Sequence, residues 1–471
     1  MAAERVCLMV WDGLRPDMVS RELTPNLWRM ANQGVWFERS HAVYPTLTRA
    51  NSPAIATGCL PGKAGVPGNT FCLPATNRPT TYSTGDVTQL EKLAAADGRP
   101  VLLVDTLADR VHRAGGRTVV LGSGSPGSAW LQHPRALACG DLVLHRSVPG
   151  MEEVMQALHE RFGPPPKLGL PASDWTRYCT RIVAEHVVPE LTPTLLVFWH
   201  TDPDHTSHAR GLLAPETAHA IHAADQNLGS ILDAYDRSGL RQSTDVVVTS
   251  DHGASTITRR VRPAFDLQTL GTHGAVAENG GSVFVYSAAR RTIDSVRQLD
   301  YAGPVFTADG GHGTLPLARA GLDGPRAPDL VFSLDWSDDE VNGVQGAAAG
   351  TFSKMVVDHG TISPFEVRTT LVACGPDFRT GWRDPVPVGN IDICPTLTHV
   401  LGLEPGTDCD GRVLHEALRD GADGAPAWDA EQEVTTFAAR GTDWVQRVDF
   451  ERVGRTTYLA GGRVTPASEA P

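Results

Sequence analysis

Two threonines, Thr46 and Thr48, lie two residues apart in the stretch YPTLTRANSPAIATG at residues 44–58. An arginine, an asparagine and a run of small residues follow them, which is a poor pattern for a core strand and places the second threonine at the entrance of a helix. A threonine hydroxyl is a weak nucleophile in water, but a neighbouring metal ion lowers its pKa and makes it reactive at neutral pH. The stretch therefore predicts a nucleophile, provided that the chain also supplies metal ligands.

Aspartates and histidines stand beside apolar runs of strand length. Asp12 follows the run at 5–11, Asp204 and His208 follow the run at 194–199, Asp251 and His252 follow the run at 245–249, and His359 shortly precedes the run at 368–375. The carboxyl ends of strands line the ligand crevice of an open α/β sheet, so these groups are expected to converge.

A convergent group of Asp and His residues favours a metal site. Three carboxylates close together repel one another unless cations lie between them. Mixed Asp and His ligation suits Zn²⁺, and two such ions could hold the attacking and leaving oxygens of an in-line displacement. The spacing D-x-x-x-H puts both side chains on one face of a helical turn. The stretch TDPDHTSH offers two Asp and two His, so its register stays open.

The remaining pattern predicts an α/β fold with a mostly parallel sheet and helices on both faces. Bare apolar runs are typical of strands that are buried on both sides, and they occur at 5–11, 117–122, 194–200, 245–250 and 368–375. Helical patterns lie between them, at 24–34, 106–116, 151–163 and 214–239.

Three parts of the chain differ in texture. We expect a catalytic core made of residues 1–252 and 356–420, in which the stretch at 390–403 closes the α/β pattern. Residues 253–355 are rich in glycine and short strands, which predicts an inserted cap region. Residues 421–471 form a C-terminal extension, with a polar loose connection followed by a terminal hairpin.

Composition excludes some classes of protein. The 471 residues carry a net charge of −13, which argues against binding nucleic acid or an anionic membrane through bulk charge. No stretch approaches the ~18–20 apolar residues of a membrane span. The N-terminus shows no signal-peptide pattern, and the eight scattered cysteines predict reduced thiols. A cytoplasmic enzyme is expected; its oligomeric state stays open, a homo-oligomer included.

Taken together, the motifs resemble the nucleotide pyrophosphatase/phosphodiesterase family (type I phosphodiesterases) of the alkaline phosphatase superfamily. The resemblance rests on stretches along nearly the whole chain, namely VWDGLRPD, TPNLWRMANQGV, YPTLTRANSPAIATGCLPGKAGVPGN, DPDHTSH, SDHG, DHGTISPFEVRTTLVACGPDF and DICPTLTHVLGLEPGTDCDGRVL. It implies an alkaline-phosphatase-like fold.

The resemblance also implies roles for particular residues. The family's nucleophile lies three residues before an asparagine, which selects Thr48, with Asn51 donating to a phosphoryl oxygen and Thr46 left as a structural residue that pins the turn. Two zinc ions per chain are implied, with manganese or iron as substitutes. One zinc is held by Asp204, His208 and His359, and the other by Asp12, Thr48, Asp251 and His252.

Some positions remain open between alternatives. His273 and His312 compete with His359, which is favoured because the family's last ligand directly precedes a core strand ending in G-P-x-F, as CGPDF does here. Arg49 stands where the family commonly has an aromatic residue, which suggests a second anionic or polar group on the substrate; the alternative is an Arg49 side chain that points into solvent. Arg49 and Asn69 are expected to bind substrate.

The implied activity is hydrolysis of phosphodiester or phosphoanhydride bonds in a small-molecule substrate through a phospho-threonine intermediate, with diesters preferred. A C–P bond hydrolase similar to phosphonoacetate hydrolases and a phosphomonoesterase are the alternatives on the same scaffold. The lysines that phosphonoacetate hydrolases use are missing from residues 119–134, and the sulfatase pattern C/S-x-P-x-R is absent. A binding or structural protein that has lost the chemistry is the alternative outside this class.

Overall fold

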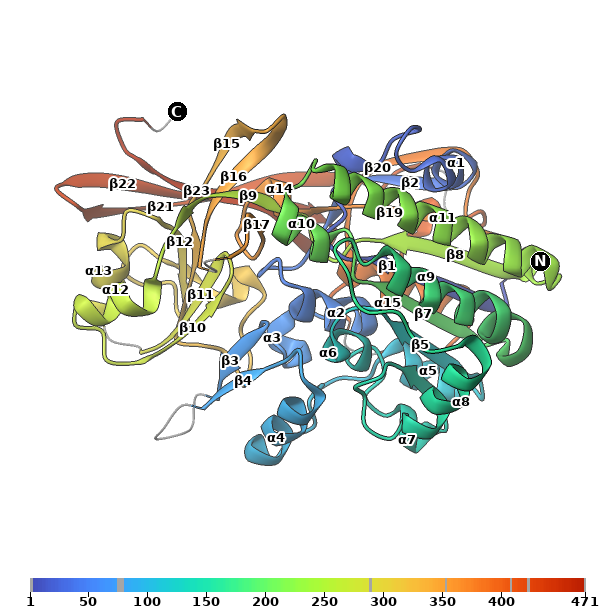
Figure 1. Cartoon of the computed structure of the whole chain (residues 1–471). Coiled ribbons are helices and arrows are strands. Elements are labelled where there is room, and N and C mark those ends of the chain that lie inside the picture. The colour runs from blue at the N-terminus through green and yellow to red at the C-terminus, as the bar shows by residue number, and fades with distance from the viewer. Residues whose placement is uncertain are drawn as a thin grey trace.

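The computed structural model describes residues 3–73, 80–287, 290–351, 354–406, 409–421 and 424–469. A nine-stranded sheet lies at its centre (Figure 1). Its strands, in spatial order, are β18 (Arg368–Thr369), β2 (Val35–His41), β19 (Leu371–Cys374), β8 (Thr244–Thr249), β1 (Arg5–Trp11), β7 (Leu195–His200), β5 (Thr118–Gly122) and β6 (Leu142–Leu144), with β20 (Trp382–Gly389) beside β2.

Most neighbouring strands of this sheet run parallel. β1 lies between β7 and β8 and is parallel to both, and β5 is parallel to β6 and β7. The predicted mostly parallel α/β sheet is therefore confirmed. The apolar run at 368–375 also forms strands, but β19 is antiparallel to both β8 and β2.

Helices cover both faces of the sheet (Figure 1). Their bounds are α1 (Pro25–Gln33), α2 (Thr48–Thr57), α3 (Pro61–Ala64), α4 (Val87–Asp97), α5 (Leu107–Arg113), α6 (Pro126–Trp130), α7 (Ala136–Cys139), α8 (Glu152–Phe162), α9 (Ser173–Ile182), α10 (Asp204–Arg210), α11 (Pro215–Arg237), α12 (Pro263–Thr269), α13 (Arg290–Gln298), α14 (Pro364–Val367) and α15 (Asn390–Val400). The four predicted helices are confirmed as α1, α5, α8 and α11. Local signals fix their ends: Pro25 opens α1, and Thr106 and Asp109 form a capping box on α5.

Two further sheets lie beside the central one. A five-stranded sheet contains β10 (Ala275–Asn279), β11 (Ser282–Tyr286), β14 (Leu330–Leu334), β12 (Ala302–Thr307) and β13 (Leu315–Pro316). A four-stranded sheet contains β15 (Trp336–Val341), β16 (Val344–Gly350), β9 (Ser255–Arg260) and β17 (Val357–Asp358), and β3 (Thr70–Cys72) pairs with β4 (Thr81–Ser83). The short strands expected in 253–355 are thus present, while the three-part division of the chain stays a prediction.

The C-terminal region differs from the predicted hairpin. It is a three-stranded antiparallel sheet of β21 (Trp428–Ala439), β22 (Thr442–Val453) and β23 (Thr456–Pro466). A third strand is present because the apolar side chains of β22 and β23, including Val448, Phe450 and Leu459, pack into a core shared with the preceding sheets. Residues 422–423 of the predicted connection lie outside the described residues.

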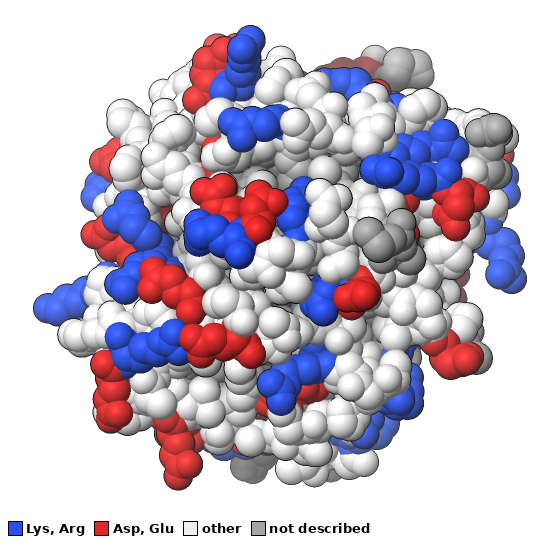
Figure 2. All heavy atoms as spheres, turned by 90° about the vertical axis from the view of Figure 1, so that its right-hand side faces the viewer, with Lys and Arg blue, Asp and Glu red and all other residues white. Residues whose placement is uncertain are grey.

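The surface mixes charges of both signs. On the face shown in Figure 2, Lys and Arg side chains alternate with Asp and Glu side chains without a large field of one sign. Among the described residues, no helix combines the length and apolarity needed to cross a bilayer.

Candidate active site

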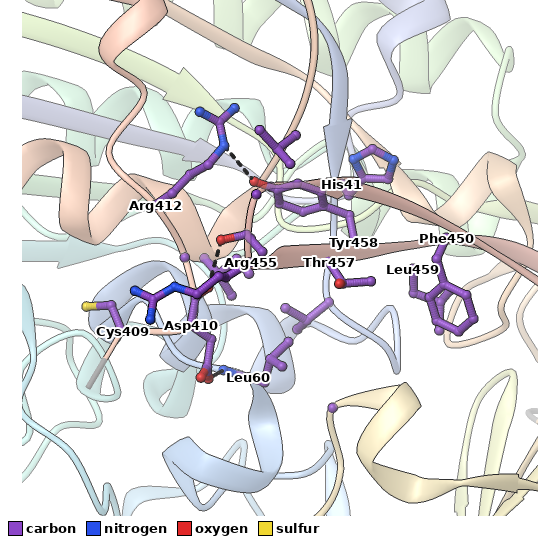
Figure 3. A pocket seen from close by; sticks show the side chains of 18 of the residues that line it. His41, Leu60, Cys409, Asp410, Arg412, Phe450, Arg455, Thr457, Tyr458 and Leu459 are labelled. Atoms are coloured by element: carbon purple, nitrogen blue, oxygen red, sulfur yellow. Dashed lines mark hydrogen bonds between the residues drawn. The ribbon is translucent and has the colours of Figure 1, made fainter. Parts of the chain in front are cut away.

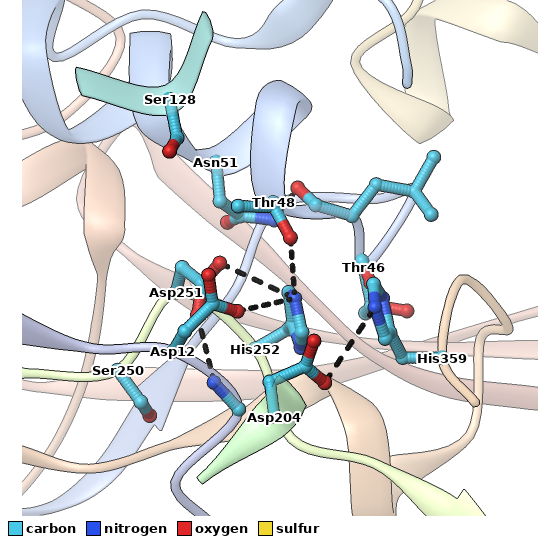
Figure 4. Close-up of polar contacts among 12 residues, drawn as sticks. Asp12, Thr46, Thr48, Asn51, Ser128, Asp204, Ser250, Asp251, His252 and His359 are labelled. Carbon is cyan, nitrogen blue, oxygen red and sulfur yellow. Dashed lines mark hydrogen bonds and ion pairs between the residues drawn. The ribbon is translucent and has the colours of Figure 1, made fainter. Parts of the chain in front are cut away.

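The predicted ligands meet near the carboxyl ends of three central strands, and all of them except His208 are labelled in Figure 4. Asp12 follows β1, Asp204 opens α10 after β7, and Asp251 and His252 follow β8. His208 lies one turn after Asp204 on α10, and His359 follows β17. The ligand atoms form three overlapping groups within 4.8 Å, which are Asp12–Asp251–His252, Asp204–His252–His359 and His208–Asp358–His359.

Each of the three histidines is held by a backbone carbonyl. The Nδ1 atoms of His208, His252 and His359 lie 2.7, 2.8 and 2.7 Å from the carbonyl oxygens of Val357, Gly253 and Thr46. An Nδ1–H that donates to a carbonyl leaves the lone pair on Nε2, which is the arrangement of metal-binding histidines. All three Nε2 atoms point toward the carboxylates of the site.

One oxygen of each carboxylate is buried and accepts no hydrogen bond from the described residues: Asp12 Oδ1, Asp204 Oδ1 and Asp251 Oδ2. His252 Nε2 lies 3.5 Å from the Asp12 oxygen and 3.2 Å from the Asp251 oxygen, and His359 Nε2 lies 3.8 Å from the Asp204 oxygen. Lone pairs on both sides of these gaps repel each other, whereas a bound cation would satisfy both. The residues present therefore fit a metal site.

Burial and the neighbouring charges also shift the pKa values of these carboxylates and of His359. Burial, followed by the charges of Asp251 and Asp204, raises the pKa of Asp12 well above its ordinary value. Burial also raises the pKa of Asp251, and burial followed by the neighbouring His252 lowers that of His359. For Asp204 burial favours a higher pKa, but His208 and His359 outweigh it and the pKa is lowered. At Asp12 and Asp251, by contrast, no neighbouring positive charge outweighs burial.

Thr48 is the first residue of α2 and is buried. Its Oγ1 lies 3.1 Å from His252 Nε2, so the hydroxyl faces the Asp12–Asp251–His252 group (Figure 4). The N-terminus of a helix also favours anions through its free amides and dipole. The predicted nucleophile thus stands where a negatively charged phosphoryl group would be stabilised.

Thr46 is fully buried and turned away from this group. Its hydroxyl donates to the Thr361 carbonyl (2.8 Å) and to Glu366 (3.1 Å), and it accepts a hydrogen bond from the Gly360 amide (2.9 Å). Its carbonyl also accepts the hydrogen bond from His359 Nδ1. These contacts agree with the structural role expected for Thr46, which pins the 359–361 turn against the nucleophile segment.

The Asn51 side chain is hydrogen-bonded within the protein. Its Oδ1 accepts from the Val43 amide (2.8 Å) and from Asn390 Nδ2 (3.0 Å), and its Nδ2 lies 3.1 Å from the Leu47 carbonyl oxygen. The side chain therefore fixes the turn before α2. Donation by Asn51 to a phosphoryl oxygen stays a prediction, because in this structure the asparagine, one turn into a buried helix, is bonded to nearby backbone groups.

Asn69 contacts the residue that follows Thr48. Its Oδ1 accepts a 3.0 Å hydrogen bond from the backbone amide of Arg49, which orients the carboxamide and leaves Nδ2 as a donor. The contact joins residues 20 positions apart in the sequence.

Arg49 lies within range of the charges of the acidic group. Burial lowers its pKa, while the charges of Asp12, Asp204 and Asp251 act in the opposite direction. Its Nε is buried and has no hydrogen-bond partner among the described residues. A substrate anion could therefore pair with this guanidinium.

The competing ligands lie elsewhere. His273 and His312 are exposed, and neither belongs to a ligand group found among the described residues. Asp202 accepts hydrogen bonds from the Ala172 amide (2.8 Å) and the Thr206 amide (3.1 Å), so it has a structural role. The register of TDPDHTSH in this structure thus places Asp204 and His208 at the site.

Sequence reasoning did not single out Asp358. This residue is buried with its Oδ2 unsatisfied by the described residues, and burial raises its pKa to about 7. It belongs to the ligand group with His208 and His359. The tripeptide Asp-His-Gly occurs twice, at 251–253 and 358–360, and this repetition is the signal that could have identified it.

Comparisons with known proteins agree with this geometry. The sequence model of the family described as type I phosphodiesterase / nucleotide pyrophosphatase matches residues 6–337. Human ectonucleotide pyrophosphatase/phosphodiesterase family member 7 is 21% identical over 235 residues, which are 46% of this chain and 47% of that protein. The mouse member 7 is 28% identical over 250 residues, 49% of this chain and 52% of that protein. The chain thus spans about half the length of these curated relatives.

Solved structures show the same fold. Murine ectonucleotide pyrophosphatase/phosphodiesterase 5 has a TM-score of 0.64 at 18% identity, covering 88% of this chain and 100% of that one. An inactive variant of the same murine protein in complex with AMP has a TM-score of 0.63 at 18% identity, covering 88% of this chain and 99% of that one. The central sheet and the family match together show that this chain belongs to the type I phosphodiesterase/nucleotide pyrophosphatase family of the alkaline phosphatase superfamily, a family of hydrolytic enzymes.

Proposed function

We propose that the protein is a two-metal hydrolase of phosphodiester or phosphoanhydride bonds in small molecules. The observation that carries this proposal is the set of buried carboxylate oxygens that face histidine lone pairs beside the Thr48 hydroxyl. Asp204, His208 and His359 would hold one cation, and Asp12, Thr48, Asp251 and His252 the other. Zn²⁺ suits this mixture of oxygen and nitrogen ligands. When bound, such ions neutralise phosphoryl oxygens and lower the pKa of coordinated hydroxyl groups.

The chain's own residues position the reaction. Thr48 Oγ1 attacks phosphorus in line with the departing oxygen, which gives a phospho-threonine and releases the first product. The amides at the start of α2 and the Asn69 carboxamide would donate to the phosphoryl oxygens, on which negative charge develops during the attack. Water then hydrolyses the phospho-threonine and regenerates the hydroxyl.

Arg49 favours a substrate with a further negative charge. A diester presents two non-bridging oxygens, whereas a monoester or a nucleotide carries an additional anionic oxygen or phosphate. A guanidinium beside the nucleophile, with Nε unsatisfied among the described residues, could pair with that group. Phosphomonoester hydrolysis is therefore the second candidate activity.

The test measures metal content and activity together. Elemental analysis of the purified protein should find two transition-metal ions per chain, and a chelator should abolish hydrolysis of bis(4-nitrophenyl) phosphate until metal is restored. His359→Ala should lose about one ion and most activity, while the matched variants His273→Ala and His312→Ala should keep both ions. Full activity in metal-free protein would contradict the proposal.

A further inference from the structure

Three cysteines gather at the end of helix α2 that lies away from Thr48. Cys59 follows Gly58, the residue that ends α2, Cys394 belongs to α15, and Cys409 lies in the loop after α15. The Cys409 sulfur lies 3.4 Å from the Thr57 carbonyl oxygen, and the Cys59 sulfur lies 3.8 Å from the same oxygen. The side chains of both Cys59 and Cys394 are hydrogen-bonded to Cys409. One sulfur thus sits between two other thiols.

A buried arginine lies against the same sulfur. Arg110 of α5 donates from Nη2 to Cys409 Sγ at 3.4 Å and from Nη1 to Thr398 Oγ1 at 3.0 Å. Hydrogen bonds from Cys394, Cys59 and Arg110 lower the pKa of Cys409. The hydrogen bond to Cys409 is the largest cause that raises the pKa of Cys59, and burial raises it further. The nearby Asp410 carboxylate is paired with Lys63 at 3.1 Å.

The three thiols differ in access. Cys409 is half-buried and lines a cavity of about 1080 Å³ (Figure 3), whereas Cys59 and Cys394 are 1% and 0% exposed. A small oxidant in the cavity can therefore reach Cys409 directly. Cys59 lines a second cavity of about 420 Å³ but, like Cys394, has almost no exposed surface, so Cys409 is the thiol that an oxidant reaches most easily.

We propose that Cys409 is a peroxide-reactive cysteine that forms a reversible disulfide with Cys59. The thiolate attacks one oxygen of a hydroperoxide, the O–O bond breaks, and the products are a sulfenic acid on Cys409 and the alcohol or water formed by protonation of the leaving oxygen. The Cys59 sulfur then attacks the Cys409 sulfur, the S–O bond breaks, and water leaves with the Cys59 proton. The peroxide is reduced by two electrons and the two thiols are oxidised by two.

Cys59 is the expected partner because backbone hydrogen bonds already join the loop that carries Cys409 to the end of α2. The amides of Asp410 and Gly411 donate to the Gly58 carbonyl at 2.9 and 3.1 Å, so the loop that carries Cys409 is held against the residue preceding Cys59. The Leu60 amide donates to Asp410 at 2.8 Å. A disulfide at this position would connect the loop covalently to the end of the helix whose first residue is Thr48.

The experiment uses the full chain, reduced with dithiothreitol and then freed of it. Hydrogen peroxide is added at pH 7, remaining thiols are alkylated, and peptides are mapped by mass spectrometry. The wild type should form a Cys59–Cys409 disulfide that dithiothreitol reverses. Cys59→Ser should instead accumulate a sulfenic acid on Cys409, trapped by dimedone, whereas Cys394→Ser should form the same disulfide as the wild type.

A second measurement tests the thiolate without any variant. Cys139 is also half-buried, but burial raises its pKa. Between pH 8 and pH 6, alkylation of Cys139 by iodoacetamide should slow about tenfold per pH unit, while alkylation of Cys409 should stay nearly constant. A Cys409 that reacts no faster than Cys139 at pH 6, or a disulfide between Cys409 and Cys394, would overturn the proposal.

Discussion

Thr46 and Thr48 are the same residue type two positions apart, yet their surroundings give them opposite roles. The hydroxyl of Thr48 faces a histidine Nε2, while that of Thr46 makes three hydrogen bonds to the 360–366 segment. The difference follows from the start of α2, which turns one side chain toward the carboxylates and the other into the protein.

Substitution of each threonine by alanine should separate these roles. Thr48→Ala should lower kcat by roughly 10³-fold or more, because it removes the atom that forms the covalent intermediate. Thr46→Ala should lower the free energy of unfolding by about 1–3 kcal/mol, since it leaves buried partners unsatisfied. Turnover and urea unfolding of both variants provide the check. Equal losses of kcat in two stably folded variants would contradict the assignment.

Arg49 is tested by substrate charge. Arg49→Ala should raise KM for 4-nitrophenyl phosphate and for nucleotides. It should leave KM for a singly charged diester such as bis(4-nitrophenyl) phosphate nearly unchanged, because only the former substrates offer an additional negative charge for the guanidinium. Arg49→Lys keeps the charge but loses bidentate pairing, and should fall between the two. A uniform rise in KM for all substrates would show that Arg49 does not discriminate by charge.

At the scale of elements, the sequence predicts most helices and strands of the central sheet region. The α11 helix follows from its helical pattern, and the strands β1, β7 and β8 follow from bare apolar runs. The ends of these strands predict where Asp12, Asp204 and Asp251 lie. The antiparallel direction of β19 could not be predicted, because a short apolar run fits either direction. The role of Asn51 could not be predicted either, since it depends on Val43 and Asn390, whose contacts exist only in the folded chain.

The strand β8 contains a buried carboxylate that does not belong to the site. Burial, together with the charge of Asp377, raises the pKa of Asp245 to about 8. Its Oδ2 has no hydrogen-bond partner among the described residues. Because the folded-state pKa lies above the ordinary value of 3.8, the folded protein binds this proton more tightly than the unfolded chain does, and stability falls as pH rises from about 4 to 8.

Asp245→Asn removes this titration while keeping the shape of the side chain. The variant should match the wild type in thermal unfolding at pH 4.5 and unfold at a higher temperature at pH 8.5, where the wild type must bury a charge or hold a proton. Thermal unfolding curves of the wild type and the variant at pH 4.5 and pH 8.5 provide the check. A shift of equal size at the two pH values would show that the charge of Asp245 is not responsible.

At the scale of the whole molecule, the C-terminal sheet is bound to the edge of the central sheet through charge. Glu451 on β22 accepts hydrogen bonds from Arg39 Nε on β2 (3.1 Å) and Arg368 Nη2 on β18 (2.7 Å), and it lies 3.3 Å from His41 Nε2. Only 6% of its side chain is exposed. Apolar residues of β22 and β23 pack into two of the cores, so this sheet contributes to the fold of the whole chain.

Glu451→Gln should reveal how much the negative charge of residue 451 contributes to the free energy of unfolding. Burial acts to raise the pKa of Glu451, but His41 and Arg39 outweigh it, so the folded-state pKa lies below the ordinary 4.5. The stabilisation is therefore complete above about pH 4.5 and is lost as pH falls through the folded-state pKa. At pH 7 the variant should lose about 3 kcal/mol of unfolding free energy, since the arginines and His41 remain without their partner.

The pH dependence distinguishes lost charge from disturbed packing. The difference between wild type and Glu451→Gln in urea unfolding should shrink steadily as pH is lowered from 5 to 3, because the unfolded wild-type chain then binds a proton at Glu451 that the folded protein does not. Glu433→Gln on β21 is the matched control: it removes a half-exposed pair with Arg319 and should change stability by less than about 1 kcal/mol at either pH. If the Glu451→Gln deficit stayed constant down to pH 3, the C-terminal sheet would be held by packing alone and the charge at residue 451 would have no part in it.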